Sequence, residues 1–240
     1  MHTYNMFLTE LKTLNNYLNN ILVKEWIHKS QSSADTLILF VFWKSEELCL
    51  CIDYYKLNVI IIKNCYFLSL TSELLDWLSD STVFSKIDLQ NIYHWIHIYE
   101  DDEWKTAFHT CYKHFKYQVM SFNLINTSVI FQVYINYALQ DLVNNFCIIY
   151  LDNILVFFKS EEEHYQHLKL IIEYLWCAEL YANLKKYKFF KIEIKYLDFL
   201  VNKNNLHMNF SYIKIIFDWC SYLFKIFYNI QIFIEFCNFY

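Results

Sequence analysis

Apolar residues recur with helical spacing in several stretches of the chain. This spacing predicts helices over residues 9–25, 73–79, 128–143 and 161–178. In the first of them, Leu11, Leu14 and Leu18 repeat every three or four positions, as in an amphipathic helix that packs against a core. Ser160 and Glu163 have the spacing of a capping box, which marks the start of the last helix.

Short apolar or alternating runs separate these helices. They predict strands over residues 37–43, 48–53, 83–89, 92–98, 115–120, 146–158 and 187–201. The run 146–158 has two apolar arms around Asp152 and Asn153, a pair that suits a hairpin turn. Because strands pair through hairpins while helices are interspersed among them, the order of elements predicts an α+β fold rather than a regular βαβ alternation.

The composition adds two constraints. The chain has 240 residues, of which 56% are hydrophobic, so it can bury a sizeable core and is not expected to be disordered. It has no glycine, which excludes P-loops and the dinucleotide fingerprint, and it has neither proline nor arginine. Codons for these absent residues are rich in G and C, whereas the abundant Phe, Tyr, Ile, Asn and Lys have codons rich in A and T. The composition therefore indicates mutational drift, and we expect turns that break the usual residue preferences.

Charge and cysteine content restrict the class of protein further. The net charge is −5, which is not the basic balance typical of a nucleic-acid binder. The densest basic stretch, Lys185 to Lys195, is either a solvated helix face or a local patch for phosphate. None of the eight cysteines forms a C-x-x-C pair, which indicates reduced intracellular thiols rather than a zinc site. The N-terminal residues lack the signal-peptide pattern and no long uncharged apolar run occurs, so we expect an intracellular protein without a membrane partner.

Two acidic residues lie in apolar strands and are candidates for chemistry. Asp88 ends the strand predicted over 83–89, and Asp152 lies at the tip of the hairpin 146–158. A carboxylate in such a place is costly unless it is exposed, hydrogen-bonded or bound to metal. If the two converge, they could hold divalent metal for phosphoryl transfer. Since an aspartate in a hairpin turn is often only a turn residue, spacing alone leaves both interpretations open.

Two other polar clusters are interpreted as structural. The run Glu100–Glu103 is expected to be a solvated turn, although it is the richest acidic cluster. His164 and His167 lie three positions apart on a predicted helix, and no third ligand with suitable spacing accompanies them. They are therefore expected to be surface histidines rather than metal ligands.

Six blocks of residues, in a fixed order, carry a family resemblance. They are Cys51–Asn58, Phe84–Tyr93, Trp104–Phe108, Met120–Gln132, Tyr150–Leu155 and Tyr196–Phe199. The block Tyr150–Leu155 resembles the core motif of reverse transcriptases from gypsy-type long-terminal-repeat retrotransposons. The others resemble the fingers, the palm, the template and nucleotide pocket, the primer grip and a stretch typical of these elements. The resemblance covers nearly the whole chain.

The resemblance implies an α+β fold of the polymerase right-hand type, with fingers, a palm built on an antiparallel sheet, and no complete thumb. Residues 1–80 would form an N-terminal extension and fingers, 81–201 the palm with part of the fingers interleaved, and 202–240 the start of the thumb or connection. The implied activity is RNA-directed DNA synthesis by two-metal nucleotidyl transfer, with Mg²⁺ or Mn²⁺ as cofactor. The implied partners are deoxynucleotides and an RNA or DNA primer–template, in the cytoplasm or nucleus. An organelle and any oligomeric state stay open.

The resemblance also implies roles for single residues. The catalytic residues would be Asp88, Asp152 and Asn153, of which Asp88 and Asp152 would hold the metal. The nucleotide pocket would include Tyr93, Phe122 and Gln132, and the primer grip would include Tyr196, Leu197, Asp198 and Phe199. In the family, an aromatic side chain at the position of Tyr93 screens out the ribose 2′-hydroxyl. Gln132 either contacts the template or faces solvent.

The chain departs from the family pattern at several of these positions. Asn153 stands where the family has a carboxylate, and Asn123 and Asp198 stand where it has glycine. The resemblance implies that side chains there intrude where the backbone approaches template or primer, and Asp198 would repel a primer phosphate. These changes agree with decay of a retroelement copy by C-to-T mutation. They imply an impaired or inactive polymerase, and the alternative is a catalytically dead remnant with at most weak nucleic-acid binding.

Overall fold

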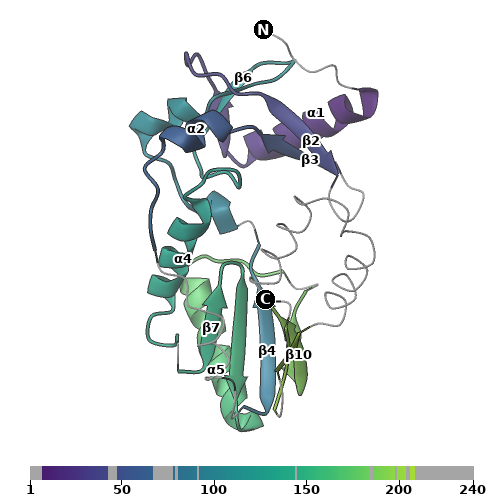
Figure 1. Ribbon diagram of the computed structural model, residues 1–240, viewed down its shortest axis with the longest axis vertical. Coiled ribbons are helices and arrows are strands. Elements are labelled where there is room, and N and C mark those ends of the chain that lie inside the picture. The colour runs from purple at the N-terminus through teal and green to yellow at the C-terminus, as the bar shows by residue number, and fades with distance from the viewer. Residues whose placement is uncertain are drawn as a thin grey trace, which may run out of the picture.

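The computed structural model describes most of the first 208 residues. The described residues are 7–42, 48–66, 78, 81–90, 92–143, 145–183, 186–197, 199–203 and 206–208. In Figure 1, α1, α2, β2 and β3 gather at one end of the long axis, and β4, β7, β10 and α5 at the other. The predicted helix over 73–79 lies outside the described residues except for Leu78.

The N-terminal end combines one long helix with two small antiparallel sheets. Its elements are α1 (Leu8–Val23), β1 (Ile27–Lys29), β2 (Ile38–Phe42), β3 (Leu48–Ile52), α2 (Tyr55–Ile60), β5 (Phe108–His109) and β6 (His114–Tyr117). One sheet has the order β1-β6-β5, and the other pairs β2 with β3. The predicted apolar stripe is confirmed, since Leu14, Leu18 and Ile21 of α1 are buried against Ile27 and Phe108 of these sheets.

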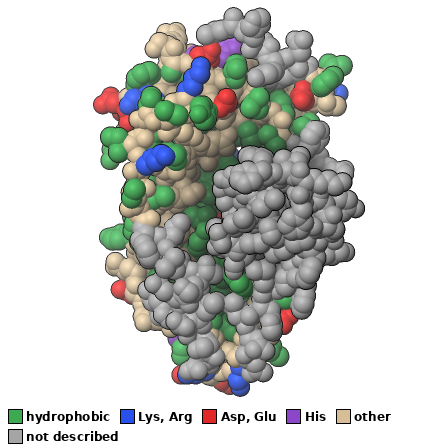
Figure 2. Space-filling view, in the orientation of Figure 1, with side chains coloured by type: hydrophobic (Ala, Val, Ile, Leu, Met, Phe, Trp, Pro, Cys, Tyr) green, Lys and Arg blue, Asp and Glu red, His purple; other side chains and the backbone are tan. Residues whose placement is uncertain are grey.

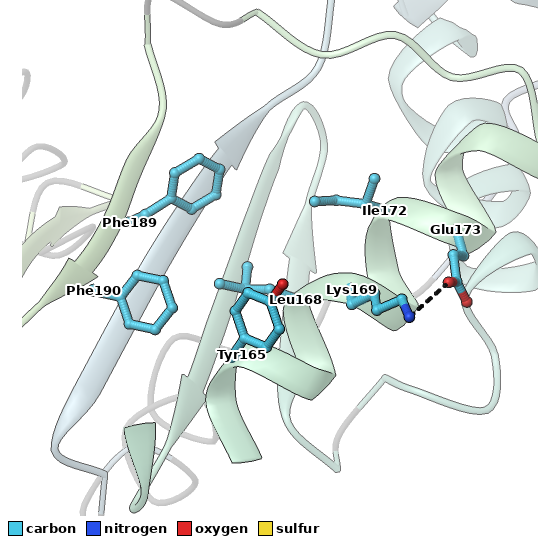
Figure 3. Close-up of a pocket in the computed structure, with 7 residues that line it drawn as sticks. All are labelled: Tyr165, Leu168, Lys169, Ile172, Glu173, Phe189 and Phe190. Atoms are coloured by element: carbon cyan, nitrogen blue, oxygen red, sulfur yellow. Dashed lines mark ion pairs between the residues drawn. The ribbon is translucent and has the colours of Figure 1, made fainter. Parts of the chain in front are cut away.

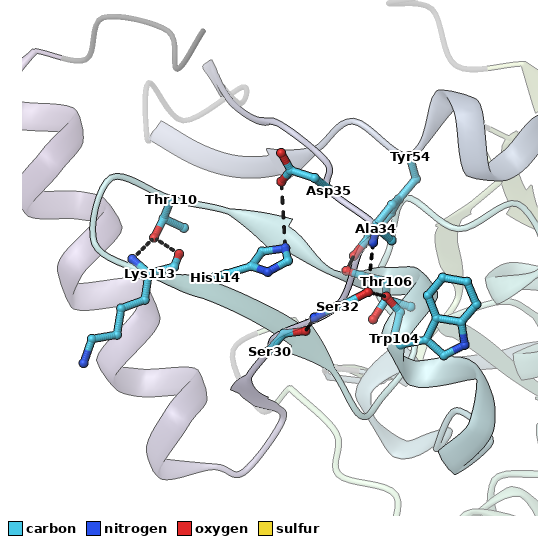
Figure 4. A network of polar contacts seen from close by, with 10 residues as sticks. All are labelled: Ser30, Ser32, Ala34, Asp35, Tyr54, Trp104, Thr106, Thr110, Lys113 and His114. Atoms are coloured by element: carbon cyan, nitrogen blue, oxygen red, sulfur yellow. Dashed lines mark hydrogen bonds and ion pairs between the residues drawn. The ribbon is translucent and has the colours of Figure 1, made fainter. Parts of the chain in front are cut away.

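A polar network fixes the segment that joins β1 to β2 (Figure 4). The Ser32 hydroxyl donates to the Trp104 carbonyl at 2.8 Å, and the His109 amide donates to the Thr36 carbonyl at 2.9 Å. His114 lies 3.8 Å from the Asp35 carboxylate. Side-chain and backbone contacts therefore hold this segment against residues that lie about 70 positions further along the chain.

The other end is an antiparallel sheet covered on both faces. The sheet has the order β7-β8-β4-β9, formed by β4 (Val83–Asp88), β7 (Cys147–Tyr150), β8 (Asn153–Phe158) and β9 (Lys188–Lys191). Two helices, α4 (Thr127–Ala138) and α5 (Glu161–Cys177), supply apolar residues to one core cluster with Ile87 and Val156. The second sheet, of β10 (Glu193–Tyr196), β11 (Phe199–Asn202) and β12 (Leu206–Met208), shares another cluster with Phe84 and Leu155. Alternate side chains of β4 and β8 therefore pack into two different core clusters, one on each face of the sheet.

Turns without glycine carry backbone strain. Among the described residues, left-handed φ angles between 45° and 56° occur in turns at Glu25, Leu151, Glu179 and Leu197, and within β9 at Phe190, where the pairing with β4 is irregular. Each costs about 1–2 kcal/mol for a residue with a Cβ. The expectation of turns that break residue preferences is therefore confirmed, and one of them, at Leu151, lies in the β7–β8 hairpin.

Some local predictions are wrong. The run 92–98, expected to be a strand, contains the 3₁₀ helix η1 (Ile92–Trp95), because a short apolar run without a clear period does not distinguish the two structures. The run Glu100–Glu103 opens a second 3₁₀ helix, η2 (Glu100–Thr106), and is not wholly solvated. Glu103 is buried there and pairs with Lys116 at 2.6 Å.

The start of α5 also differs from the prediction. Ser160 is the residue before the helix, but its hydroxyl bonds to the Glu162 carboxylate at 2.8 Å instead of capping the backbone. The expected capping box is therefore not formed. In the part of the chain that the structure describes, no helix is long and apolar enough to cross a bilayer.

Candidate active site

The hairpin β7–β8 brings the two candidate carboxylates together. Asp88 is the last residue of β4 and pairs in register with Asn153, the first residue of β8. The Leu89 amide donates to the Asp152 carbonyl at 2.8 Å, so the hairpin turn lies against the end of β4. The structure therefore places Asp88, Asp152 and Asn153 at one edge of the sheet, as the convergence hypothesis requires.

The charges at this edge act on one another. Burial raises the pKa of Asp152, and the negative charge of Asp88 raises it further. The Asn153 amide donates to the Asp152 carboxylate at 2.7 Å. Lys186 reaches Asp88, with its ammonium 3.1 and 3.3 Å from the two carboxylate oxygens. Two mutually repelling carboxylates are thus partly compensated by an amide and an ammonium.

Lys86 adds a second positive charge on β4. Burial lowers the pKa of Lys86, while the negative charges of Asp88 and Asp152 act in the opposite direction. Lys188 of β9 pairs in register with Lys86. The strand prediction over 187–201 is confirmed here, since Lys188 and Lys191 lie in β9. The alternative of a helix face over 185–195 is therefore wrong, although both lysines are exposed as expected.

Gln132 of α4 holds the strained hairpin turn. Its side-chain oxygen accepts the Leu151 amide at 2.8 Å, and its nitrogen donates to the Ile149 carbonyl at 3.2 Å and to Asn136 at 2.9 Å. The side chain is only 3% exposed. The alternative in which Gln132 faces solvent is therefore wrong, and its place in a nucleotide pocket stays a prediction.

Two aromatic side chains lie beside the carboxylates. The rings of Tyr93 and Phe122 are 5.6 Å apart between centroids, and Phe122 is 64% exposed. Burial raises the pKa of the Tyr93 hydroxyl, a hydrogen bond with Ser128 lowers it, and the charge of Asp152 raises it. The Tyr93 hydroxyl therefore lies within electrostatic range of the Asp152 carboxylate. The two predicted pocket aromatics are thus neighbours.

The predicted primer-grip residues form the β10–β11 hairpin. Tyr196 and Phe199 face each other in the register of this hairpin, and Leu197 adopts a left-handed φ of 45° in its turn. The buried Tyr196 hydroxyl donates to the Asn153 carbonyl at 3.5 Å, so the hairpin touches the carboxylate edge. Asp198 lies outside the described residues.

Sequence reasoning missed a buried serine–histidine contact. His164 is fully buried rather than at the surface, and its Nε2 lies 2.7 Å from the Ser85 hydroxyl oxygen. The Ser85 oxygen also accepts the Phe190 amide at 3.0 Å. Burial lowers the pKa of His164 to about 4. The contact therefore links β4, β9 and α5 through a neutral imidazole, and its partners lie too far apart in sequence for a local pattern to predict it.

An apolar groove of about 480 Å³ lies between α5 and β9. Figure 3 shows Phe189 and Phe190 of β9 on one side, with Tyr165 and Ile172 of α5 across from them. Lys169 and Glu173 pair along its rim at 3.9 Å. None of the predicted site residues lines this groove, which is therefore distinct from the carboxylate edge.

Comparison with solved structures defines the class of the fold. The structure of the foamy viral protease-reverse transcriptase dRH in complex with ds DNA matches all of this chain and 42% of that chain, with a TM-score of 0.86 and 19% identity. The foamy viral protease-reverse transcriptase in complex with RNA/DNA hybrid matches with a TM-score of 0.81 and 18% identity, over all of this chain and 32% of that chain. The predicted right-hand polymerase fold is therefore confirmed.

Sequence comparison narrows this class to a family. Residues 42–201 match the family described as reverse transcriptase (RNA-dependent DNA polymerase). The Transposon Tf2-7 and Tf2-3 polyproteins of Schizosaccharomyces pombe are each 31% identical over 194 residues, which is 81% of this chain and 15% of each polyprotein. The chain thus spans about a seventh of the length of these relatives. It belongs to the reverse transcriptase family, and these relatives are retrotransposon polyproteins.

Proposed function

We propose that this chain is a slow RNA-directed DNA polymerase domain from a decayed gypsy-type retrotransposon. The observation that carries the proposal is the convergence of Asp88 and Asp152 where β4 meets the β7–β8 turn. This edge lies beside an aromatic pair and two lysines, so acidic, basic and stacking groups meet at one place. Such a set suits a substrate that has phosphates and a base.

The two carboxylates fit a divalent cation. The charge of Asp88 raises the pKa of Asp152, so the two negative charges repel each other, and a cation between them would relieve that repulsion. Mg²⁺ is commonly held by one or two carboxylates together with substrate phosphates. Asp88 and Asp152 would hold it here. Bound Mg²⁺ or Mn²⁺ would stabilise the charge that develops on the phosphate oxygens.

The other residues of the site would bind and orient the substrates. Lys86 and Lys186 place positive charge beside the carboxylates, where a triphosphate would be attracted. Tyr93 and Phe122 offer ring surface to the sugar and base of an incoming nucleotide. The hairpin that holds Tyr196 rests on the Asn153 carbonyl, and would place a primer end next to the carboxylates.

Asn153 makes the proposed polymerase slow. A carboxylate at this position would add a full negative charge, whereas the Asn153 amide is uncharged and donates a hydrogen bond to Asp152. A unit charge about 4 Å from a cation contributes about 4 kcal/mol at an effective dielectric of about 20. If half of this served the transition state, its loss would slow the reaction more than about tenfold.

The proposed nucleic-acid partner is a primer–template duplex with deoxynucleotides. The similar foamy viral enzyme has been solved with dsDNA and with RNA/DNA hybrid, which supports a duplex partner. On the face shown in Figure 2, lysine and acidic side chains are interspersed over the N-terminal end, so this face does not present a single basic field. We therefore expect weak, salt-sensitive binding that depends on few phosphate contacts.

Primer extension on RNA and DNA templates with Mg²⁺ tests the proposal. We expect slow extension on RNA by the chain as it is, extension at least about tenfold faster by Asn153→Asp, and none by Asp152→Asn. Thermal melting of each variant verifies that it is folded. If folded Asn153→Asp extends neither template, the proposal is wrong and the catalytically dead remnant is the better description.

A further inference from the structure

The short helix α2 makes few apolar contacts with the body of the protein. None of its residues is fully buried, and Tyr55, Val59 and Ile60 are 73%, 68% and 75% exposed. Leu57, with Ile61 after the helix, packs partly buried against the N-terminal core. Apolar packing normally fixes the position of a helix, and here polar contacts add to this limited packing.

Side-chain amides supply these polar contacts. The Asn58 amide nitrogen donates to the Asn123 carbonyl at 2.8 Å, and the Asn58 oxygen accepts the Ile125 amide at 2.9 Å. In return, the Asn123 amide nitrogen donates to the Ile52 carbonyl at 2.7 Å. Each segment thus reaches across to the backbone of the other.

A third asparagine repeats the pattern one step further along. The Asn126 amide nitrogen donates to the Ile62 carbonyl at 2.8 Å, and its oxygen accepts the Asn64 amide at 3.0 Å. We call the side chains of Asn58, Asn123 and Asn126 the amide clasp. Its hydrogen bonds all join residues 52–64 to residues 123–126, which lie more than 60 positions later.

The clasp lies next to the aromatic pair of the site. Phe122 immediately precedes Asn123, and its ring is 5.6 Å from that of Tyr93. Burial raises the pKa of the Tyr93 hydroxyl, and Ser128, two residues after Asn126, lowers it. Phe122 is 64% exposed, so its position depends on the turn that carries it more than on packing around its ring.

We propose that the amide clasp positions Phe122 against Tyr93 and thereby sets the selectivity of the pocket for the sugar of a nucleotide. This inference rests on the proposed function. It also corrects the expectation that Asn123 intrudes on the template, because its side chain points to the Ile52 carbonyl. Asn123 is therefore a positioning residue in this chain, and a glycine there could not make the bond.

The test measures sugar selectivity in a complex that cannot react. The chain binds an RNA template with a dideoxy-terminated primer in Mn²⁺, and the dissociation constants of dUTP and UTP, which differ only in the 2′-hydroxyl, are measured opposite adenine. The variants are Asn58→Ala, which removes two bonds of the clasp, Asn123→Ala, and Asn58→Asp, which keeps the acceptor for Ile125. Asn145→Ala is the control, because it removes an equivalent amide-to-carbonyl bond, to Asp141, in a separate exposed turn.

We expect the UTP-to-dUTP ratio of dissociation constants to fall at least fivefold in Asn58→Ala, less in Asn123→Ala and Asn58→Asp, and not in Asn145→Ala. Hydrogen exchange at residues 122–125 should accelerate in the same order. An unchanged ratio in folded Asn58→Ala and Asn123→Ala overturns the inference. If the unaltered chain binds neither nucleotide, the proposed function fails instead. In that case, hydrogen exchange at residues 122–125 tests the positioning role of the clasp alone. Exchange that is unchanged in Asn58→Ala and Asn123→Ala overturns that role.

Discussion

Replacing Asn153 by aspartate should make the stability of the fold depend on divalent metal. The Asn153 amide now donates to the Asp152 carboxylate at 2.7 Å, and the change substitutes a second negative charge at that place. Two unit charges at this separation repel by about 1.5 kcal/mol in bulk water and by about 6 kcal/mol at an effective dielectric of about 20. Both side chains are half-buried, so we take about 2 kcal/mol, nearer the water limit.

The expected result is a lower melting temperature that Mg²⁺ restores. A loss of about 2 kcal/mol lowers the melting temperature of a chain of this size by about 4–8 °C. Repulsion raises the pKa of the carboxylate pair in the folded state above its unfolded value, as the charge of Asp88 already does for the buried Asp152. The loss is therefore present at pH 7, declines as the pH falls through the raised pKa, and is gone below the unfolded value of about 3.9. Mg²⁺ binds the folded site and should recover most of the difference.

The assay is thermal melting of the unaltered chain and Asn153→Asp, in EDTA and in millimolar Mg²⁺. Asn145→Asp is the control, because it adds the same charge at an exposed turn away from the carboxylate edge. The reasoning is refuted if Asn153→Asp melts at the temperature of the unaltered chain in EDTA at pH 7. It is also refuted if Asn153→Asp has the same melting temperature in Mg²⁺ as in EDTA.

Three further predictions concern the contacts around this edge. Because burial lowers the pKa of His164 to about 4, the folded state resists its protonation, and stability should fall by about 1–2 kcal/mol between pH 7 and pH 5 in urea unfolding. His164→Gln should remove that slope, and an equal slope in the variant would contradict the assignment. Lys186→Met should cost about 1 kcal/mol of unfolding free energy in EDTA and less in Mg²⁺, since its partner Asp88 is buried. An equal cost in both conditions would count against a cation at Asp88. Gln132→Ala should lower the unfolding free energy by about 1–3 kcal/mol because it leaves the Leu151 amide unpaired. Gln132→Met, which fills a similar space but cannot accept the bond, should lose a similar amount, and an unchanged unfolding free energy in Gln132→Met would show that the bond to Leu151 is unimportant.

The sequence predicts elements whose pattern is local. The sequence predicts α1, the β7–β8 hairpin and α5 within a few residues of their bounds, because periodic apolar spacing and a turn pair are visible in a short window. The turn itself is displaced by one residue from the predicted pair, since it consists of Leu151 and Asp152, and Asn153 begins β8. The strand β4 is predicted in the same way, and with it the position of Asp88. Spacing alone leaves the convergence of Asp88 with Asp152 open, and only the family resemblance implies it.

The contacts that complete the site are not local. Lys186 meets Asp88 from 98 positions away, and His164 meets Ser85 from 79 positions away. A window of sequence shows only that these residues are polar, so it predicts a surface position for His164 and leaves the lysines open between a solvated face and a patch for phosphate. Asn123 was interpreted as damage for the same reason, since its partner, the Ile52 carbonyl, becomes its neighbour only in the fold.

The central claim is that Asp88 and Asp152 form the metal centre of a polymerase site. The most direct test is a crystal structure of the chain with a dideoxy-terminated primer–template, dTTP and Mn²⁺, with the metal located by anomalous scattering. The account predicts Mn²⁺ between the Asp88 and Asp152 carboxylates and Lys186 displaced from Asp88. Crystals of the ternary complex with no Mn²⁺ at either carboxylate, and with Lys186 still bound to Asp88, would contradict it.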